Sequence, residues 1–304
     1  MENIKPFQRR KAWTNLAEVA TARLEQSGRV LMSEYDLFHL IWSIYDARSA
    51  KNLRGKYPSR QTYWRTRTML REEGIIRHDN NYPSFWQIMA IPDASADTVV
   101  CQADPYCYIS HLSAMQRYGL TNRRPESLFI TSPSDIIARS WNKQRIERDF
   151  GKKILEQNIE IEPLYLTHHP KFVRRRPVEQ LKTKFYGDWR NIRGEDQRVA
   201  AIGQVFLDML DDPQRCGGMR HVLSVWKENS RKYLVQIIEA VEKADRPILK
   251  VRAGYILDEY LGIHDTHVLS WLQYAQRGGS RVLEAGRDYT EPLSEKWMLS
   301  INVG

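Results

Sequence analysis

The spacing of hydrophobic residues over the first ninety positions predicts three helices followed by a hairpin. Residues 15–28, 33–52 and 60–74 each carry apolar side chains at intervals of three and four, which is typical of a helix with one buried face. Ser33 and Ser59 stand where N-caps are expected. After Gly74 the chain becomes extended, turns at DNNYPS and returns as the strand FWQIMAI.

The third helix has an apolar stripe and a basic face. Tyr63, Thr66 and Leu70 fall on one side of a helical projection, so we expect them to pack inward. The opposite side is polar and is predicted to face outward; it comprises Arg60, Gln61, Trp64, Arg65 and Thr68. Arg and Gln are side chains that read base edges through paired hydrogen bonds, and Thr can contact a thymine methyl group.

Three helices followed by a two-stranded turn are the layout of a winged helix-turn-helix, in which the third helix enters the DNA major groove. We therefore expect Ser59 and the outward residues of the third helix to lie at the DNA. Cations on either side of them would hold phosphates and fix the register; these are Arg54, Lys56, Arg71 and Arg77. The alternative is an amphipathic helix with a solvated basic face.

The charge distribution favours the DNA hypothesis. Residues 48–77 hold nine Lys/Arg and two Asp/Glu, whereas an ordinary solvated helix mixes both signs. The net charge is +5 over residues 1–95, +6 over 96–194 and −2 over 195–304. A polyanionic partner is therefore expected for the first two thirds of the chain.

The fold class expected for the whole chain is α+β: an N-terminal winged helix-turn-helix, then a mixed α/β C-terminal domain. Residues 92–105 are rich in small and polar side chains and are predicted to be a connector. Strands are expected at 127–131 and 159–167, a hairpin arm at 185–194 and a strong amphipathic helix within 195–218. The expected domains are a DNA-binding domain over 1–95, a basic mixed α/β domain over 96–194 and a mainly helical part over 195–304.

The sequence leaves open whether two further basic clusters contact nucleic acid. Arg139, Lys143 and Arg145 begin a cluster that continues to Lys153, and Arg174 to Arg176 form a short run. The functional hypothesis is a second nucleic-acid contact, which places Arg139, Lys143 and Arg145 among the candidate DNA-binding residues. The alternative is a solvated helix and loop. Three acids near the amphipathic helix are expected at the surface: Asp208, Asp211 and Asp212. The alternative for them is a contact with a basic partner protein.

Several segments of the last two hundred residues carry a resemblance to a known family. They are YISHLSAMQRYGLT at 108–121, SLFITSPS at 127–134, RVAAIGQVFLDMLDDPQRCGGMRHV at 198–222, GYILDEYLG at 254–262 and SRVLEAGRDYTEPLSEKWMLSIN at 280–302. Through the order of these segments rather than any one of them, the chain from about residue 105 onward resembles the AbiEi-type antitoxin and transcriptional regulator family of bacterial type IV toxin–antitoxin systems.

The resemblance implies a winged helix that represses its own promoter and a C-terminal antitoxin-type domain that opposes a nucleotidyltransferase-like toxin in phage defence. The expected partner is double-stranded DNA with an inverted repeat, bound by two protomers. The N-terminal unit and residues 138–158 are longer than the family pattern. These differences leave open a stand-alone regulator on a mobile element. Two independent alternatives are a nucleic-acid-processing enzyme targeted by its winged helix and a protein-interaction module for an acidic partner.

The sequence predicts no enzyme, no cofactor and no metal. It lacks a phosphate-binding Gly-Lys-Ser/Thr loop, a His-Glu-x-x-His motif and a Gly-x-Ser-x-Gly turn. Glu160 and Glu162 lack the preceding Asp and following Lys that a nuclease motif requires, and His168 and His169 are expected to form a solvated loop pair.

No apolar run is long enough to span a membrane, no secretory signal is present, and three cysteines at irregular spacing indicate a reduced, cytoplasmic protein.

Overall fold

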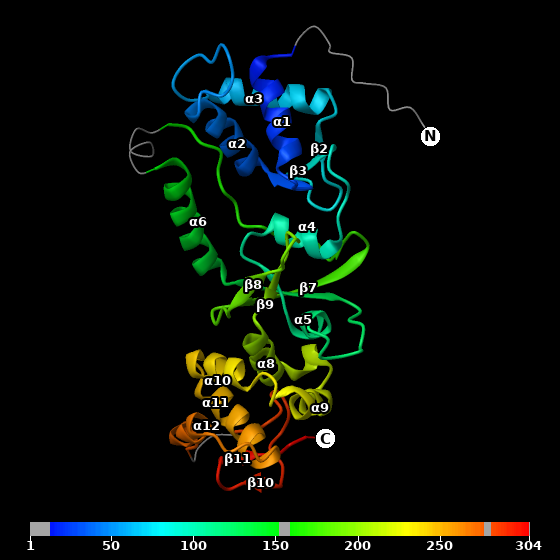
Figure 1. The fold of residues 1–304 in the computed structure, drawn as a ribbon, viewed down its shortest axis with the longest axis vertical. Coiled ribbons are helices and arrows are strands. Elements are labelled where there is room, and N and C mark those ends of the chain that lie inside the picture. Colours follow the sequence, from blue (N-terminus) through cyan, green and yellow to red (C-terminus); the bar gives the residue numbers. More distant parts are fainter. Residues whose placement is uncertain (1–12, 152–158, 277–280, 304) are drawn as a thin grey trace. The chain divides into compact units, whose positions relative to one another are not determined.

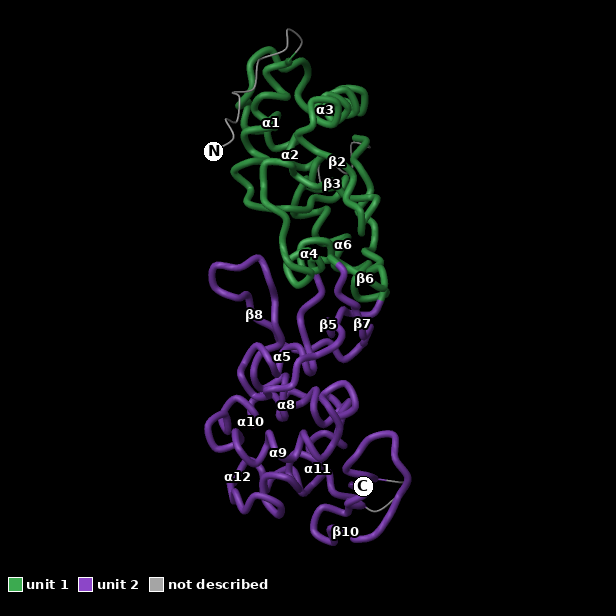
Figure 2. The backbone as a smooth tube through the Cα atoms, turned by 90° about the vertical axis from the view of Figure 1, so that its right-hand side faces the viewer, with its two compact units in different colours: residues 1–105, 135–174 green, residues 106–134, 175–304 purple. Residues whose placement is uncertain are grey.

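The structure is a computed structural model that describes residues 13–151, 159–276 and 281–303. It contains both helices and β-sheets, so the expected α+β class is confirmed. The chain forms two compact units, each built from two segments: unit 1 comprises residues 1–105 and 135–174, and unit 2 comprises residues 106–134 and 175–304 (Figure 2). Residues 135–174, expected in a middle domain, thus group with the N-terminal segment.

Unit 1 combines five helices with a small sheet and a short strand among its described residues (Figure 1). The helices are α1 (Asn15–Gln26), α2 (Glu34–Asp46), α3 (Arg60–Glu72), α4 (Ala96–Ala103) and α6 (Asp135–Phe150). The strands are β1 (Leu31–Ser33), β2 (Ile76–His78), β3 (Phe85–Ile88) and β6 (Phe172–Val173).

Side-chain caps fix where the first three helices begin. Thr14, Ser33 and Ser59 each accept a hydrogen bond from the backbone N–H three residues later, at 3.2, 3.0 and 3.2 Å. The two predicted serine caps are confirmed. Helix α2 ends at Asp46, six residues before the expected end at 52, because Arg48 and Asn52 take positive φ values that a helix cannot contain.

The predicted hairpin is confirmed as β2 and β3, which pair antiparallel. A short strand that the sequence pattern did not indicate, β1, adds to the other edge of β3, so the sheet order is β1-β3-β2. Met32 pairs with Trp86, and Arg77 pairs with Gln87. The apolar side chains of this sheet and of α1 to α3 form the core of the unit.

The expectation of a polar connector at 92–105 is wrong. Ser95 caps helix α4, whose Val99, Val100 and Cys101 are buried. The side-chain oxygen of Gln102 accepts hydrogen bonds from the backbone N–H groups of Val30 and Leu31, at 3.0 and 2.9 Å. Helix α4 is therefore part of unit 1, and the first division between the units falls after residue 105.

Residues 135–174 complete the core of unit 1. Phe150, at the end of α6, is buried and meets the rings of Phe38 and Trp42 of α2 at centroid distances of 6.0 and 5.0 Å. The strand expected at 159–167 is wrong, since the structure has no strand there. Ile159, Ile161 and other apolar residues of that segment instead pack on the core formed by the helices.

Unit 2 carries a mixed sheet in which β5 pairs parallel with β7 and antiparallel with β4, β4 pairs parallel with β9, and β9 pairs antiparallel with β8. These strands are β4 (Tyr108–Ile109), β5 (Leu128–Pro133), β7 (Arg176–Thr183), β8 (Trp189–Asn191) and β9 (Arg198–Ala200). The strand expected at 127–131 is confirmed. The hairpin arm exists, but its strands lie further along the chain than predicted.

The remaining elements of unit 2 are mostly helical (Figure 1). They are α5 (His111–Arg117), α8 (Ile202–Asp211), α9 (Met219–Asn229), α10 (Leu234–Lys243), α11 (Pro247–Gly254) and α12 (Thr266–Ser270), with a short final hairpin of β10 (Leu293–Ser294) and β11 (Leu299–Ser300). The amphipathic helix expected within 195–218 is confirmed as α8, although the strand β9 occupies its expected first turn. Across the described residues, no helix has the length and hydropathy needed to cross a bilayer.

Asp208 is not at the surface as expected, since it lies buried on α8. Its Oδ1 atom accepts a hydrogen bond from Gln204 at 2.7 Å, whereas Oδ2 has no partner among the described residues. Burial, reinforced by the charge of Asp211, raises the pKa of Asp208 to about 7. Burial also lowers the pKa of His111 to about 4, so this imidazole is neutral in the folded protein. The three cysteines are buried, and none of them forms a disulfide.

These two buried groups predict opposing effects of pH on stability. Between about pH 4 and 7 the folded state keeps the Asp208 proton that the unfolded state releases, so stability falls as pH rises. Between about pH 4 and 6.5 the unfolded state holds the His111 proton that the folded state lacks, so stability rises with pH. We expect Asp208→Asn to leave only the second effect. Its free energy of unfolding should rise by about 3 kcal/mol from pH 4 to 6.5, measured by urea unfolding.

His111→Asn is the matched variant, because Asn tolerates a positive φ such as the 49° that His111 adopts. Its free energy of unfolding should fall over the same pH range. The wild type should be nearly flat between pH 4 and 6.5. The assignment is wrong if Asp208→Asn and the wild type show the same dependence on pH.

Candidate nucleic-acid interface

Helix α3 is held in place by its inward stripe. Tyr63, Thr66 and Leu70 are buried, which confirms the predicted inward face. The Tyr63 hydroxyl donates to the backbone carbonyl of Glu34 at 3.2 Å, and its ring meets Phe38 edge to face at 5.2 Å. The helix therefore has one fixed rotation about its own axis, and this rotation decides which side chains point outward.

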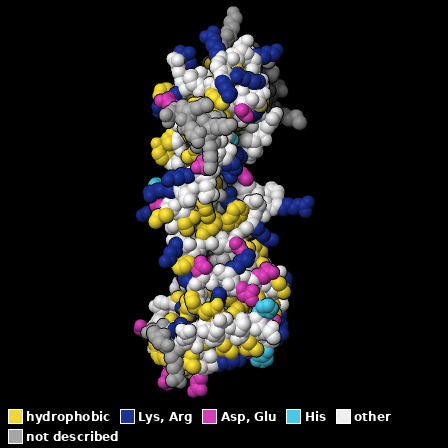
Figure 3. Space-filling view, turned by 90° about the vertical axis from the view of Figure 1, so that its left-hand side faces the viewer, with side chains coloured by type: hydrophobic (Ala, Val, Ile, Leu, Met, Phe, Trp, Pro, Cys, Tyr) yellow, Lys and Arg dark blue, Asp and Glu magenta, His cyan; other side chains and the backbone are white. Residues whose placement is uncertain are grey.

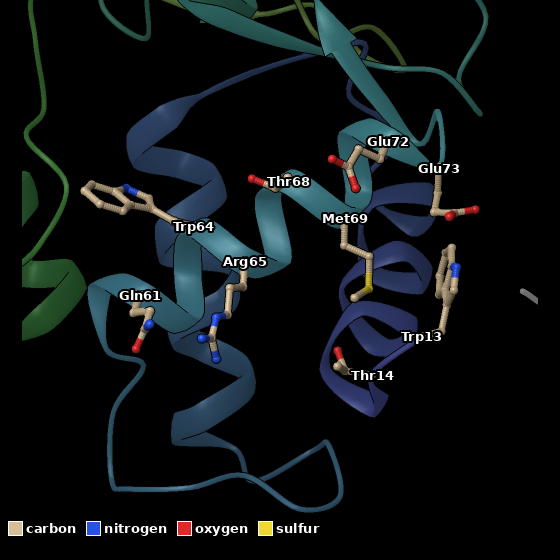
Figure 4. Close-up of a pocket in the computed structure, with 9 residues that line it drawn as sticks. All are labelled: Trp13, Thr14, Gln61, Trp64, Arg65, Thr68, Met69, Glu72 and Glu73. Atoms are coloured by element: carbon tan, nitrogen blue, oxygen red, sulfur yellow. The ribbon is translucent and has the colours of Figure 1, made fainter. Parts of the chain in front are cut away.

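The outward face of α3 carries the residues that the sequence analysis placed there. Arg60, Gln61, Trp64 and Arg65 are exposed, and Thr68 is half-buried. Figure 4 shows Gln61, Trp64, Arg65 and Thr68 projecting from one side of the helix. The Arg60 guanidinium lies 4.7 Å from the centre of the Trp64 ring, and Trp64 is 44% exposed. Trp64 thus stacks with a cation and is not part of the core.

A shallow cavity of about 520 Å³ follows this face. Its lining comprises Trp13, Thr14, Gln61, Trp64, Arg65, Thr68, Met69, Glu72 and Glu73 (Figure 4). One end is basic and polar, whereas the other end combines apolar side chains with two carboxylates. The face therefore changes character from the N-terminal to the C-terminal half of α3.

The arginines of α3 have different roles. Arg67 forms an ion pair with Glu34, whose carboxylate also accepts a hydrogen bond from the Trp86 indole. Arg67 thus ties α3 to α2 and β3. Arg60, Arg65 and Arg71 are exposed. No Asp or Glu occurs between Ala47 and Arg71, so the N-terminal half of α3 and the loop before it carry only positive charge.

Glu162 lies at one edge of the candidate face. The segment that contains it is anchored by Ile161, which packs on the core of unit 1. Burial and the charge of Glu34 raise the pKa of Glu162, while Arg60, Arg67 and a hydrogen bond from Trp64 act in the opposite direction. A carboxylate from a distant part of the chain therefore limits the basic face on this side.

The structure separates the other candidate residues into exposed and internally bonded groups. Arg54 and Lys56 are exposed in the loop that leads into α3, and Arg139 and Lys143 are exposed on α6. Helix α6 lies away from α3 within unit 1, in both views (Figures 1 and 2). Lys152 and Lys153, which belong to the same predicted cluster, lie outside the described residues.

Three predicted cations are engaged within unit 1. Arg77 donates two hydrogen bonds to the Gln87 side chain, at 3.0 and 2.9 Å. Arg145 forms ion pairs with Asp36 and Asp149, and only 18% of its side chain is exposed. Arg174 donates to Asp79 at 2.6 Å and to Asp93 at 2.9 Å. Arg145 and Arg174 connect parts of the unit, so they offer less to a ligand than the exposed cations do. Arg77 remains exposed despite its two hydrogen bonds.

His169 was expected in a solvated loop pair, and that expectation is wrong. Its side chain is 2% exposed; its Nδ1 atom lies 2.7 Å from the Tyr82 hydroxyl and its Nε2 atom 3.4 Å from a carboxylate oxygen of Asp104. Both ring nitrogens thus have hydrogen-bond partners, and a metal ion would have to displace one of them. His168 is exposed, as expected.

Sequence reasoning missed Glu34, Glu162 and Trp13 as residues that shape this face. Glu34 follows the cap Ser33, where an acid is common for reasons internal to the helix, so its contact with α3 had no separate signal. Glu162 and Trp13 reach α3 only through the tertiary fold.

No family model matches the chain, and no curated protein sequence matches it. Among solved structures, the chain is similar to the crystal structure of the RV2827C protein from Mycobacterium tuberculosis. The two share 11% sequence identity, the match covers 97% of this chain and 94% of that chain, and the TM-score is 0.47. A likeness at this level carries no argument about function.

The ion pairs of Arg145 predict a role in stability. Arg145→Ala would leave the Asp36 carboxylate, which is 12% exposed, without its ion-pair partner, and would leave Asp149, which is 10% exposed, with only the exposed Arg148. We expect a loss of about 2–4 kcal/mol in the free energy of unfolding. Arg139→Ala removes the same charge from an exposed position of the same helix and should change stability by less than about 0.5 kcal/mol. Equal stability of the two variants in urea unfolding would contradict this role.

Proposed function

We propose that the protein is a sequence-specific DNA-binding repressor whose N-terminal part is a winged helix-turn-helix. The observation that carries the proposal is the outward face of α3, where Arg and Gln side chains are exposed and Thr68 is half-buried, in a stretch that lacks any acid from Ala47 to Arg71. The order of elements also supports it: helix, strand, helix, helix and two strands, with the antiparallel sheet β1-β3-β2.

In this proposal α3 enters the major groove with its N-terminal half. Recognition helices contact base edges mainly through residues near their N-terminus. Arg60 and Arg65 would each form paired hydrogen bonds with a guanine, Gln61 would pair with an adenine, and Thr68 would contact a thymine methyl group. The N-terminal end of a helix also carries partial positive charge, which favours the nearby phosphates.

The proposed target is an inverted repeat in the promoter of the protein's own gene, bound by two protomers. A two-fold repeat in the DNA matches two copies of one domain, each with its own half-site. The resemblance of residues 105–304 to AbiEi-type antitoxins supports a second role for the C-terminal segments, in which they oppose a nucleotidyltransferase-like toxin. We assign no chemistry to the chain, so this second role is a matter of binding or regulation.

Binding to the upstream region of its own gene tests the proposal. We expect a preference of about a thousand-fold over a scrambled duplex, measured by fluorescence anisotropy at several salt concentrations. Arg65→Ala should weaken binding to the upstream duplex by about 10- to 100-fold and reduce the preference. Lys227→Ala removes the same charge from an exposed position on α9 and should leave binding unchanged.

Two results would refute the proposed function. One is equal binding of the wild type to both duplexes, with steep salt dependence, which would indicate a generic polyanion surface. The other is a preference that survives Arg65→Ala together with Arg60→Ala, which would place recognition elsewhere in the chain.

A further inference from the structure

The loop between β2 and β3, residues 79–84, is packed into unit 1. In winged helix-turn-helix proteins this loop is the wing that commonly reaches the DNA beside the recognition helix. Here Asp79 and Tyr82 are buried, at 2% and 3% exposure. Arg174 donates to the Asp79 carboxylate at 2.6 Å, and the Tyr82 hydroxyl lies 2.7 Å from His169 Nδ1.

Further hydrogen bonds fix the tip of this loop. The Asp79 carboxylate accepts from the backbone N–H groups of Asn81 and Tyr82, at 2.9 and 3.0 Å. The Asn81 side chain accepts from Arg174 at 2.7 Å and donates to the carbonyl of Phe172 at 3.4 Å. The side chains of Asp79, Asn81 and Tyr82 therefore have their polar partners within the unit. The loop itself contains no Lys or Arg, and its exposed polar side chains are those of Asn80 and Ser84.

A second loop has the properties that the β2–β3 loop lacks. Residues 47–59 join α2 to α3 and end beside Gln61, at the N-terminal end of the outward face of α3 (Figure 4). The cations of this loop are all exposed: Arg48, Lys51, Arg54 and Lys56. The loop holds no acid, whereas Glu72 and Glu73 stand at the other end of α3 and would repel phosphates.

The 47–59 loop is braced against the core. The ring of Tyr57 stacks on Trp42 at 4.5 Å with an interplanar angle of 9°, and Leu53 packs on the apolar core of unit 1. The Arg48 side chain donates to the carbonyl of Gly55 at 2.8 Å, across the loop. A loop anchored at several points presents its cations with a smaller entropic cost on binding than a mobile one does.

We infer that the 47–59 loop, and not the β2–β3 loop, makes the second DNA contact, in which Lys51, Arg54 and Lys56 hold the phosphates that flank each half-site. This inference rests on the proposed function, since it presumes that α3 lies in the major groove. Contacts to phosphates fix position without reading sequence, so the loop sets affinity and salt dependence while α3 sets specificity.

The test compares two variants of the full chain, each with several substitutions, on the same DNA. In the loop variant, Lys51, Arg54 and Lys56 are replaced by Gln. We expect its affinity for upstream and scrambled duplexes to fall by the same factor, about tenfold or more, and the slope of log K against log salt to become shallower by about 2 to 3.

In the hairpin variant, Asn80→Glu and Ser84→Glu place two negative charges on the exposed part of the β2–β3 loop. We expect its affinity to change by less than about twofold, because a repulsion from DNA that is not nearby is screened.

The opposite pattern would overturn the inference: an unchanged salt slope in the loop variant together with a large loss of affinity in the hairpin variant. An unchanged slope in the loop variant alone would also overturn it, since three phosphate contacts cannot be lost without a change in slope. Failure of the proposed function is distinguishable from either result, because it appears in the wild type as equal affinity for the two duplexes. Circular dichroism of each variant checks that it is folded.

Discussion

The arrangement of unit 1 depends on Glu34, the residue at which α2, α3 and β3 meet. Its carboxylate pairs with Arg67 and accepts a hydrogen bond from the Trp86 indole, and its backbone carbonyl accepts one from Tyr63. One residue thus holds α3 against the helix before it and the sheet after it. Because these bonds fix the rotation of α3, they also fix which of its arginines face the interior and which face outward.

A second constraint is that unit 1 is not complete without residues far along the chain. Phe150 fills a position among the rings of α2, and Arg145 neutralises Asp36 near the start of that helix. The segment that follows α6 brings Glu162 to the edge of α3 and Arg174 to the β2–β3 loop. In the sequence, the basic cluster of α6 is a candidate nucleic-acid contact. In the structure, its member Arg145 instead stabilises unit 1 through an ion pair with Asp36.

The resulting electrostatic pattern is asymmetric along α3. The loop before the helix and its first turns carry exposed cations without acids, whereas its last turn combines the exposed Arg71 with Glu72, and Glu73 follows directly. Glu162 lies at one side of the face. An extended polyanion is therefore attracted more strongly to the N-terminal end of α3 than to its C-terminal end, and this asymmetry gives the proposed DNA contact a direction that net charge alone does not supply.

The sequence by itself determined the features of unit 1 that are local. Helical periodicity and the caps at Ser33 and Ser59 located α2 and α3, and the stripe of Tyr63, Thr66 and Leu70 identified the inward face, because these signals arise from residues within one or two turns of each other. The hairpin was predicted for the same reason.

Only the tertiary structure decided the rest. It showed α4 in place of a connector, the burial of Asp208 and His169, and the division of the basic residues into exposed Lys51 and Arg54 and internally paired Arg145 and Arg174. A cation has the same local sequence signal whether it meets water, a phosphate or a buried carboxylate. Its partner is decided by chain segments that lie as many as 109 residues away, as for Arg145 and Asp36, and this pairing follows from packing rather than from periodicity.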